Sequence, residues 1–132
     1  MKKYIDTNVF LRSIDGDETT VKFITNVLEG EEKYWVQNVV LSELVWILGT
    51  SYKYSRKKIV DIVGSLIKAN NLVWTGNCDL MLAVDWFEKG LAKYNDCLIV
   101  SAMDKGDKIV SYDCEFNRFD EIKRIEPKDL IG

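Results

Sequence analysis

The 132-residue sequence contains no histidine. This absence excludes Ser-His-Asp and Cys-His nucleophilic sites, zinc sites that use histidine and a histidine general base. If the chain is an enzyme, carboxylates or a metal ion must therefore carry its proton chemistry. The chain also has only one proline, and it contains no Gly/Ser-rich linker, repeat or low-complexity segment. We therefore expect a single domain over residues 1–132.

Cysteines and long apolar runs are also few. The three cysteines form no C-x-x-C pair and are odd in number, which is typical of a reducing compartment. No segment approaches the ~20 apolar residues of a membrane span. No apolar signal-peptide core follows Lys2 and Lys3, because Asp6 comes too soon. We therefore expect a cytoplasmic protein that has no contact with the membrane.

The net charge of −3 argues against a nucleic-acid binder with an overall basic field. It still allows one in which a metal ion neutralises local acid and a few basic side chains touch phosphates. Charge therefore informs association and not the fold.

Helical and strand patterns alternate along the chain, which indicates an α/β domain with a mainly parallel sheet. Strands are expected up to Ile5 and over residues 33–37, 72–74, 109–110 and 122–125. Plausible helix caps are Thr7, Asn38, Ser55 and Asp79. After Asp79 we expect an inward apolar face made by Leu80, Ala83, Val84, Phe87 and Leu91. A helix from Asn95 or Asp96 to Gly106 is apolar almost all round, as in helices buried inside a domain.

Four acidic residues occupy positions where a charge is unexpected: Asp6 after the first strand, Glu43 in an apolar helix, Asp96 opening the most buried helix, and Asp113 after a later strand. Each has an ordinary explanation. Asp6 and Asp96 suit helix caps, Glu43 suits the edge of an exposed face, and Asp113 suits a turn. Buried carboxylates, however, must be paired, protonated or bound to metal. Oxygen-only ligands suit Mg²⁺ or Mn²⁺, and two such ions can promote phosphodiester cleavage. The spacing leaves both explanations open.

Four segments, taken in order, resemble the motifs of the PIN domain family and, within it, the VapC-type ribonuclease toxins of prokaryotes. They are Tyr4–Leu11, Ser42–Leu48, Asn95–Val100 and Ile109–Phe116. Each segment is short, but all four occur at the family's usual separations, and the resemblance runs from about Tyr4 to Pro127. It implies a three-layer α/β/α fold with a central parallel five-stranded sheet in the order 3-2-1-4-5. In that order Asp6 and Asp113 meet at the switch point of the sheet.

The resemblance also implies metal-dependent hydrolysis of RNA phosphodiester bonds. The matching catalytic acids are Asp6, Glu43, Asp96 and Asp113, of which Asp6, Asp96 and Asp113 are the expected ligands of Mg²⁺ or Mn²⁺. Residues expected to orient these ligands or the water are Thr7, Asn8 and Ser111. Glu115 is either a surface charge or a supplementary ligand. Loosely clustered candidates for phosphate contacts, equally well explained as solvated surface charges, are Arg12, Lys53, Arg56 and Lys57.

A VapC-type toxin implies a VapB-like antitoxin, encoded by a neighbouring gene, that masks the site, and it implies a homodimer. The first candidate for an interface is whichever of Trp35, Trp46, Trp74 or Trp86 is exposed. A solitary PIN-domain RNA-processing nuclease and a PIN-scaffold protein-binding module without catalysis remain alternatives, and a small gene immediately upstream would favour the toxin. An aspartate-nucleophile phosphohydrolase needs an acid where Asn8 stands, and a phosphorylation-receiver domain needs adjacent acids that are missing here.

Overall fold

Five short strands form one sheet in the computed structural model, which describes residues 1–131. They are β1 (Lys3–Ile5), β2 (Tyr34–Gln37), β3 (Leu72–Thr75), β4 (Lys108–Val110) and β5 (Lys123–Ile125). Their order is β3-β2-β1-β4-β5, and each neighbouring pair is parallel. The predicted parallel five-stranded sheet and its strand order are therefore confirmed.

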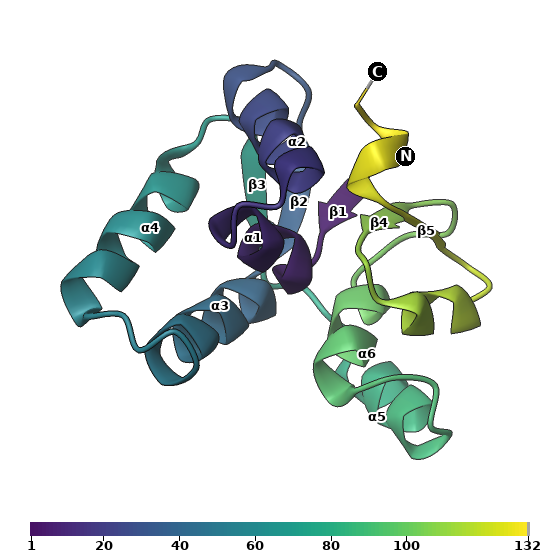
Figure 1. Ribbon diagram of the computed structural model, residues 1–132. Coiled ribbons are helices and arrows are strands. Elements are labelled where there is room, and N and C mark those ends of the chain that lie inside the picture. The colour runs from purple at the N-terminus through teal and green to yellow at the C-terminus, as the bar shows by residue number, and fades with distance from the viewer. Residues whose placement is uncertain (132) are drawn as a thin grey trace.

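Helices flank the sheet and complete a three-layer α/β/α fold (Figure 1). They are α1 (Thr7–Ile14), α2 (Glu18–Glu29), α3 (Asn38–Thr50), α4 (Arg56–Lys68), α5 (Leu80–Glu88) and α6 (Tyr94–Ser101), with the short 3-10 helices η1 (Cys114–Arg118) and η2 (Pro127–Asp129). Helix α1 packs against α2 and α3, α3 against α4, and α5 against α6. Within residues 1–131 no helix is both long enough and apolar enough to cross a bilayer.

The central strands are buried on both faces, as in parallel sheets generally. Ile5, Val36, Ile109 and Val110 are at most 1% exposed. The chain leaves β1 for β2 and β3 on one side, and it returns to β4 on the other side of β1. Crossovers that leave a strand in opposite directions open a crevice at its carboxyl end. The fold therefore places a crevice directly after β1 and β4.

The starts of the helices confirm some predicted caps and correct others. The side chains of Ser55 and Asp79 accept hydrogen bonds from the backbone N–H three residues later, as N-caps do. Thr7 and Asn38 are instead the first helical residues of α1 and α3. Asp96 lies inside the first turn of α6 and not at its cap, so helix capping does not explain this acid.

The predicted inward face of α5 is mostly wrong. Ala83 is fully buried, but Leu80, Val84 and Phe87 are 59%, 45% and 52% exposed, and Leu91 lies beyond the end of the helix. The reason is that α5 packs chiefly on α6 and lies at the lower edge of the molecule in Figure 1. Most of its apolar surface therefore has no cover within residues 1–131.

Candidate active site

A cleft of about 230 Å³ opens at the carboxyl ends of β1 and β4. It is lined by Asp6, Thr7, Asn8, Leu11, Glu43, Ile47, Lys93, Asp96 and Asp113. These residues come from α1, α3, α6 and the loop that follows β4. The structure thus brings all four candidate acids into one cleft, although they are distributed along the whole chain.

Asp6 sits directly on the switch point of the sheet. Its backbone N–H donates to the carbonyl oxygen of Val110 at 3.0 Å, and the residue is only 4% exposed. Although Asp6 occupies the N-cap position of α1, its side chain makes no capping hydrogen bond. Its Oδ2 instead accepts from the Ser111 hydroxyl at 2.7 Å. The carboxylate is therefore held toward the segment after β4 and not toward its own helix.

Ser111 and Asn8 form the network that holds this carboxylate. The Ser111 Oγ accepts from the Asn8 side-chain amide at 3.2 Å and from the Asp113 N–H at 3.0 Å. The Asn8 Oδ1 accepts from the Tyr112 N–H at 3.2 Å. Because Ser111 accepts on its other side, its single hydroxyl proton is directed to Asp6. The network fixes the loop after β4 against the start of α1.

Burial and like charges both act on Asp6. Burial raises the pKa of Asp6 from 3.8 to about 6, and the nearby charges of Glu43 and Asp113 add to this increase. Hydrogen bonds from Ser111 and from the Thr7 backbone act in the opposite direction. A carboxyl group with a pKa near this value can lose its proton near neutral pH when a cation binds to it.

Among the acids of the cleft, Asp96 has the pKa that is raised furthest from its ordinary value. It is 6% exposed, and its Oδ2 is buried without a hydrogen-bond partner among residues 1–131. Burial, followed by the charges of Asp6 and Asp113, raises the pKa of Asp96 from 3.8 to about 8, although Lys93 opposes this shift. A buried carboxylate oxygen without a donor is costly unless a cation satisfies it.

Asp113 has a local role and also faces the cleft. Its Oδ1 accepts from the Glu115 N–H at 2.9 Å and so caps η1, which fits the explanation of this acid as a turn residue. Asp96, Asp113 and Glu115 each offer a carboxylate oxygen, and these three oxygens lie within 4.8 Å of one another. The Glu115 Oε2 is also buried without a partner among residues 1–131. An oxygen-only donor set of this kind suits a hard divalent cation.

Glu43 is held by the residue that was expected to cap α1. The Thr7 hydroxyl donates to the Glu43 Oε1 at 2.8 Å, and Glu43 projects from the second turn of α3 into the cleft. This hydrogen bond ties α3 to α1 across the cleft. Glu43 is half-buried, so it combines a fixed orientation with access to solvent.

The four basic residues considered for RNA contact do not line the acidic cleft. The Arg12 guanidinium stacks over an aromatic ring, that of Tyr112, at 3.8 Å from its centroid. Arg56 lines a groove between α3 and α4, Lys57 forms an ion pair within α4, and Lys53 lies in the α3–α4 loop. Three of them therefore lie on α4 or in the loop before it, whereas Arg12 lies on α1, and none of the four lines the cleft.

Among residues 1–131, Lys93 is the one basic residue that lines the cleft, and the sequence reasoning missed it. It is exposed at the N-cap of α6, where its charge acts on Asp96. The available signal was the spacing, because residues three apart lie on the same side of a helix. That signal is weak for a surface lysine, since most exposed lysines serve only solvation.

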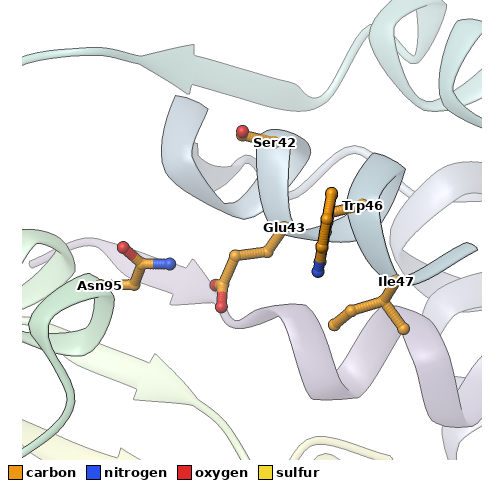
Figure 2. Close-up of a pocket in the computed structure, with 5 residues that line it drawn as sticks. All are labelled: Ser42, Glu43, Trp46, Ile47 and Asn95. Atoms are coloured by element: carbon orange, nitrogen blue, oxygen red, sulfur yellow. The ribbon is translucent and has the colours of Figure 1, made fainter. Parts of the chain in front are cut away.

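A second hollow of about 290 Å³ adjoins the acidic cleft (Figure 2). It is lined by Ser42, Glu43, Trp46, Ile47 and Asn95. Glu43 and Ile47 also line the acidic cleft, so the two spaces lie side by side. Trp46 is 70% exposed, whereas the other three tryptophans are half-buried.

Two comparisons match this architecture to known proteins. The family model described as PIN domain matches residues 3–122, a range that includes all four acids of the cleft. The chain is also 28% identical, over 122 residues, to a protein of Aquifex aeolicus (strain VF5) described as a VapC ribonuclease. That match covers 88% of this chain and 90% of the relative.

Proposed function

Because the chain belongs to the PIN domain family, we propose that it is a Mg²⁺- or Mn²⁺-dependent ribonuclease of the VapC type that hydrolyses RNA phosphodiester bonds. The observation that carries this proposal is the buried, unpartnered carboxylate oxygen of Asp96 in a cleft with three other acids. Carboxylates that lie close together in one pocket repel one another, and a bound cation offsets this repulsion. The VapC description of the Aquifex relative supports RNA as the substrate.

We assign the cation to Asp6, Asp96 and Asp113, with Glu115 as a further oxygen donor. The donor set fits, because Asp96 and Glu115 each have a buried oxygen without a partner in the described chain and all the donors are hard oxygens. A divalent cation bound there supplies Lewis-acid chemistry, which activates water and stabilises the leaving oxygen. Of the two explanations given for Glu115, a surface charge or a supplementary ligand, we therefore propose the ligand.

The remaining residues of the cleft position these groups. Ser111 and Asn8 orient Asp6, and Thr7 orients Glu43. Glu43 is placed to accept a proton from the attacking water, which is the task of a general base. The exposed ammonium group of Lys93 lies at the rim of the cleft, where it offsets the charge of the scissile phosphate.

We also propose a VapB-like antitoxin as the partner, a homodimer as the assembly and the cytoplasm as the location, with the chain folding as one domain. The antitoxin distinguishes this proposal from a solitary RNA-processing nuclease. A small gene immediately upstream of this one supports the toxin–antitoxin pair. A gene that stands alone supports the solitary nuclease with the same active site.

The test is the cleavage of a mixed pool of structured RNAs with and without Mg²⁺ or Mn²⁺. We expect the wild-type chain to cleave only with the metal, and Asp6→Ala and Asp96→Asn to be inactive. The matched control is Asp85→Asn, an exposed acid on α5, which should cleave like the wild type. Cleavage that persists in both site variants contradicts the assignment. No cleavage by any form, together with no Mn²⁺ binding in calorimetry, favours the protein-binding module.

A further inference from the structure

We propose that Trp46 is a base-stacking residue, on whose indole the nucleobase next to the scissile phosphate packs within the hollow beside the acidic cleft. This inference rests on the proposed ribonuclease function and deepens it. It identifies the substrate as single-stranded RNA with an unpaired base at the cleavage position.

The exposure of Trp46 is the first observation. Its side chain is 70% exposed, although its neighbours Leu44 and Leu48 on α3 are at most 1% exposed. Leaving a large apolar ring in water forgoes the free energy that its burial would provide. Indole rings displayed in this way serve binding partners, and stacking on a base is one of their main uses.

The location of Trp46 is the second observation. It lies three residues after Glu43, so both side chains project from the same side of α3. Figure 2 shows the Glu43 carboxylate between the Asn95 amide and the Trp46 indole. Because Glu43 and Ile47 line both spaces, a strand whose phosphate lies in the acidic cleft has its adjacent base at the hollow.

The polar lining of the hollow is the third observation. The Ser42 hydroxyl belongs to an exposed residue and the Asn95 amide to a half-buried one, and both residues border the same hollow as the indole. An amide offers both donors and an acceptor. Single-stranded RNA is recognised by this combination, an aromatic face for stacking and polar groups for the edge of the base.

A protein is the competing occupant of this surface. Trp46 also borders the groove of about 520 Å³ between α3 and α4, which is lined mainly by apolar residues such as Val45, Ile59 and Val60. That groove contains none of the cleft acids, whereas the hollow on the other side of Trp46 contains Glu43. Because the hollow shares Glu43 with the acidic cleft, RNA is the favoured occupant of the indole surface.

The experiment combines a change in the protein with a change in the RNA. Binding of a fluorescein-labelled, non-cleavable 2′-O-methyl oligonucleotide is measured by anisotropy for the wild type, Trp46→Ala and Trp46→Phe. A second oligonucleotide is abasic next to the mapped cleavage position. We expect Trp46→Ala to weaken binding roughly 10-fold and Trp46→Phe to retain most of the affinity. The abasic RNA should weaken wild-type binding similarly and have no further effect on Trp46→Ala.

The control is Leu28→Ala, which removes an exposed apolar side chain from α2, and circular dichroism checks that each variant is folded. Unchanged binding by Trp46→Ala, or losses from the variant and the abasic RNA that simply add, overturns the inference. Intact RNA binding with lost self-association or lost antitoxin binding also overturns it and assigns Trp46 to a protein interface. If the wild type binds the oligonucleotide through Trp46 but cleaves no RNA with Mn²⁺, the ribonuclease proposal fails while the stacking site stands.

Discussion

At Asp96, a buried carboxylate oxygen without a hydrogen-bond donor in the described chain faces the charges of Asp6 and Asp113. This arrangement destabilises the folded chain when no cation is bound. Proteins retain such unfavourable groups where function requires them. Asparagine has nearly the same shape as aspartate without the charge, so it relieves the repulsion.

We therefore expect Asp96→Asn to raise the melting temperature of the metal-free protein by roughly 3–10 °C at pH 9, where the wild-type carboxyl group is ionised. The same change should abolish the stabilisation that Mg²⁺ or Mn²⁺ provides. Thermal scans in EDTA and in each metal measure both effects, with Asp85→Asn as the unaffected control. A lower melting temperature of Asp96→Asn in EDTA contradicts this account of the acid.

Ser111 gives a second prediction for a single residue. Its hydrogen bond lowers the pKa of Asp6, so Ser111→Ala should raise that pKa further and let protons compete better with the cation. We expect Mn²⁺ affinity to fall roughly tenfold at pH 6 and less at pH 8, as measured by calorimetry. Ser65→Ala, which changes an exposed serine on α4, should have no effect. An equal loss at both pH values shows that Ser111 acts only through the local structure.

Among the secondary-structure elements, the ends of β1 and β4 are the most predictable from sequence. In each, a polar residue, Asp6 or Ser111, follows an apolar strand at once, and the carboxyl ends of parallel strands meet at one edge of the sheet. Asp6 and Asp113 could therefore be predicted as neighbours. The placement of Asp96 and Glu43 in the same cleft could be predicted only from the resemblance to the family. Helical spacing alone does not say which strand a helix faces.

Other features depend on tertiary packing and escaped prediction. Helix α6 ends at Ser101 and not at Gly106. Turns and bends occupy the residues between this helix and β4. Lys93 resembles any surface lysine until the fold brings the start of α6 to the same cleft as Asp6. The apolar pattern of α5 was visible, but periodicity cannot tell whether the chain itself or a partner covers an apolar face.

The exposed face of α5 leads to a prediction about assembly. Leu80, Met81, Val84 and Phe87 are between 45% and 77% exposed, an apolar surface of the kind that marks protein interfaces. We expect the proposed homodimer to form through α5. Met81→Lys should therefore yield monomers in sedimentation velocity, whereas Val60→Lys, at an exposed position on α4, should remain dimeric. The opposite pattern places the dimer interface at the α3–α4 groove.

For the whole molecule, the acids of the cleft couple folding stability to pH. The folded pKa values of Asp6 and Asp96, about 6 and about 8, both exceed the ordinary value of 3.8. Between pH 4 and pH 8 the folded chain therefore binds more protons than the unfolded chain. These two groups thus make the free energy of unfolding fall as pH rises through that range. A bound divalent cation replaces the protons and removes this penalty.

Urea unfolding at pH 5 and pH 8.5 in EDTA tests this coupling. We expect the free energy of unfolding to be lower at pH 8.5 by a few kcal/mol, and we expect Mn²⁺ to recover more stability at pH 8.5 than at pH 5. The pH dependence should be smaller in Asp96→Asn. A flat profile for the wild type in EDTA would show that the acids do not repel one another in the folded chain.

The strand order also determines when the site comes into being during protein synthesis. β1 is the first strand to be made, yet it pairs with β4, one of the last, and Asp6 depends on Ser111 for its hydrogen bond. A chain still being translated carries Asp6 and Glu43 but has no Ser111 or Asp113 to complete the cleft. Under the proposed function, the nascent polypeptide therefore cannot cleave the messenger that encodes it until β4 and the loop after it have been made.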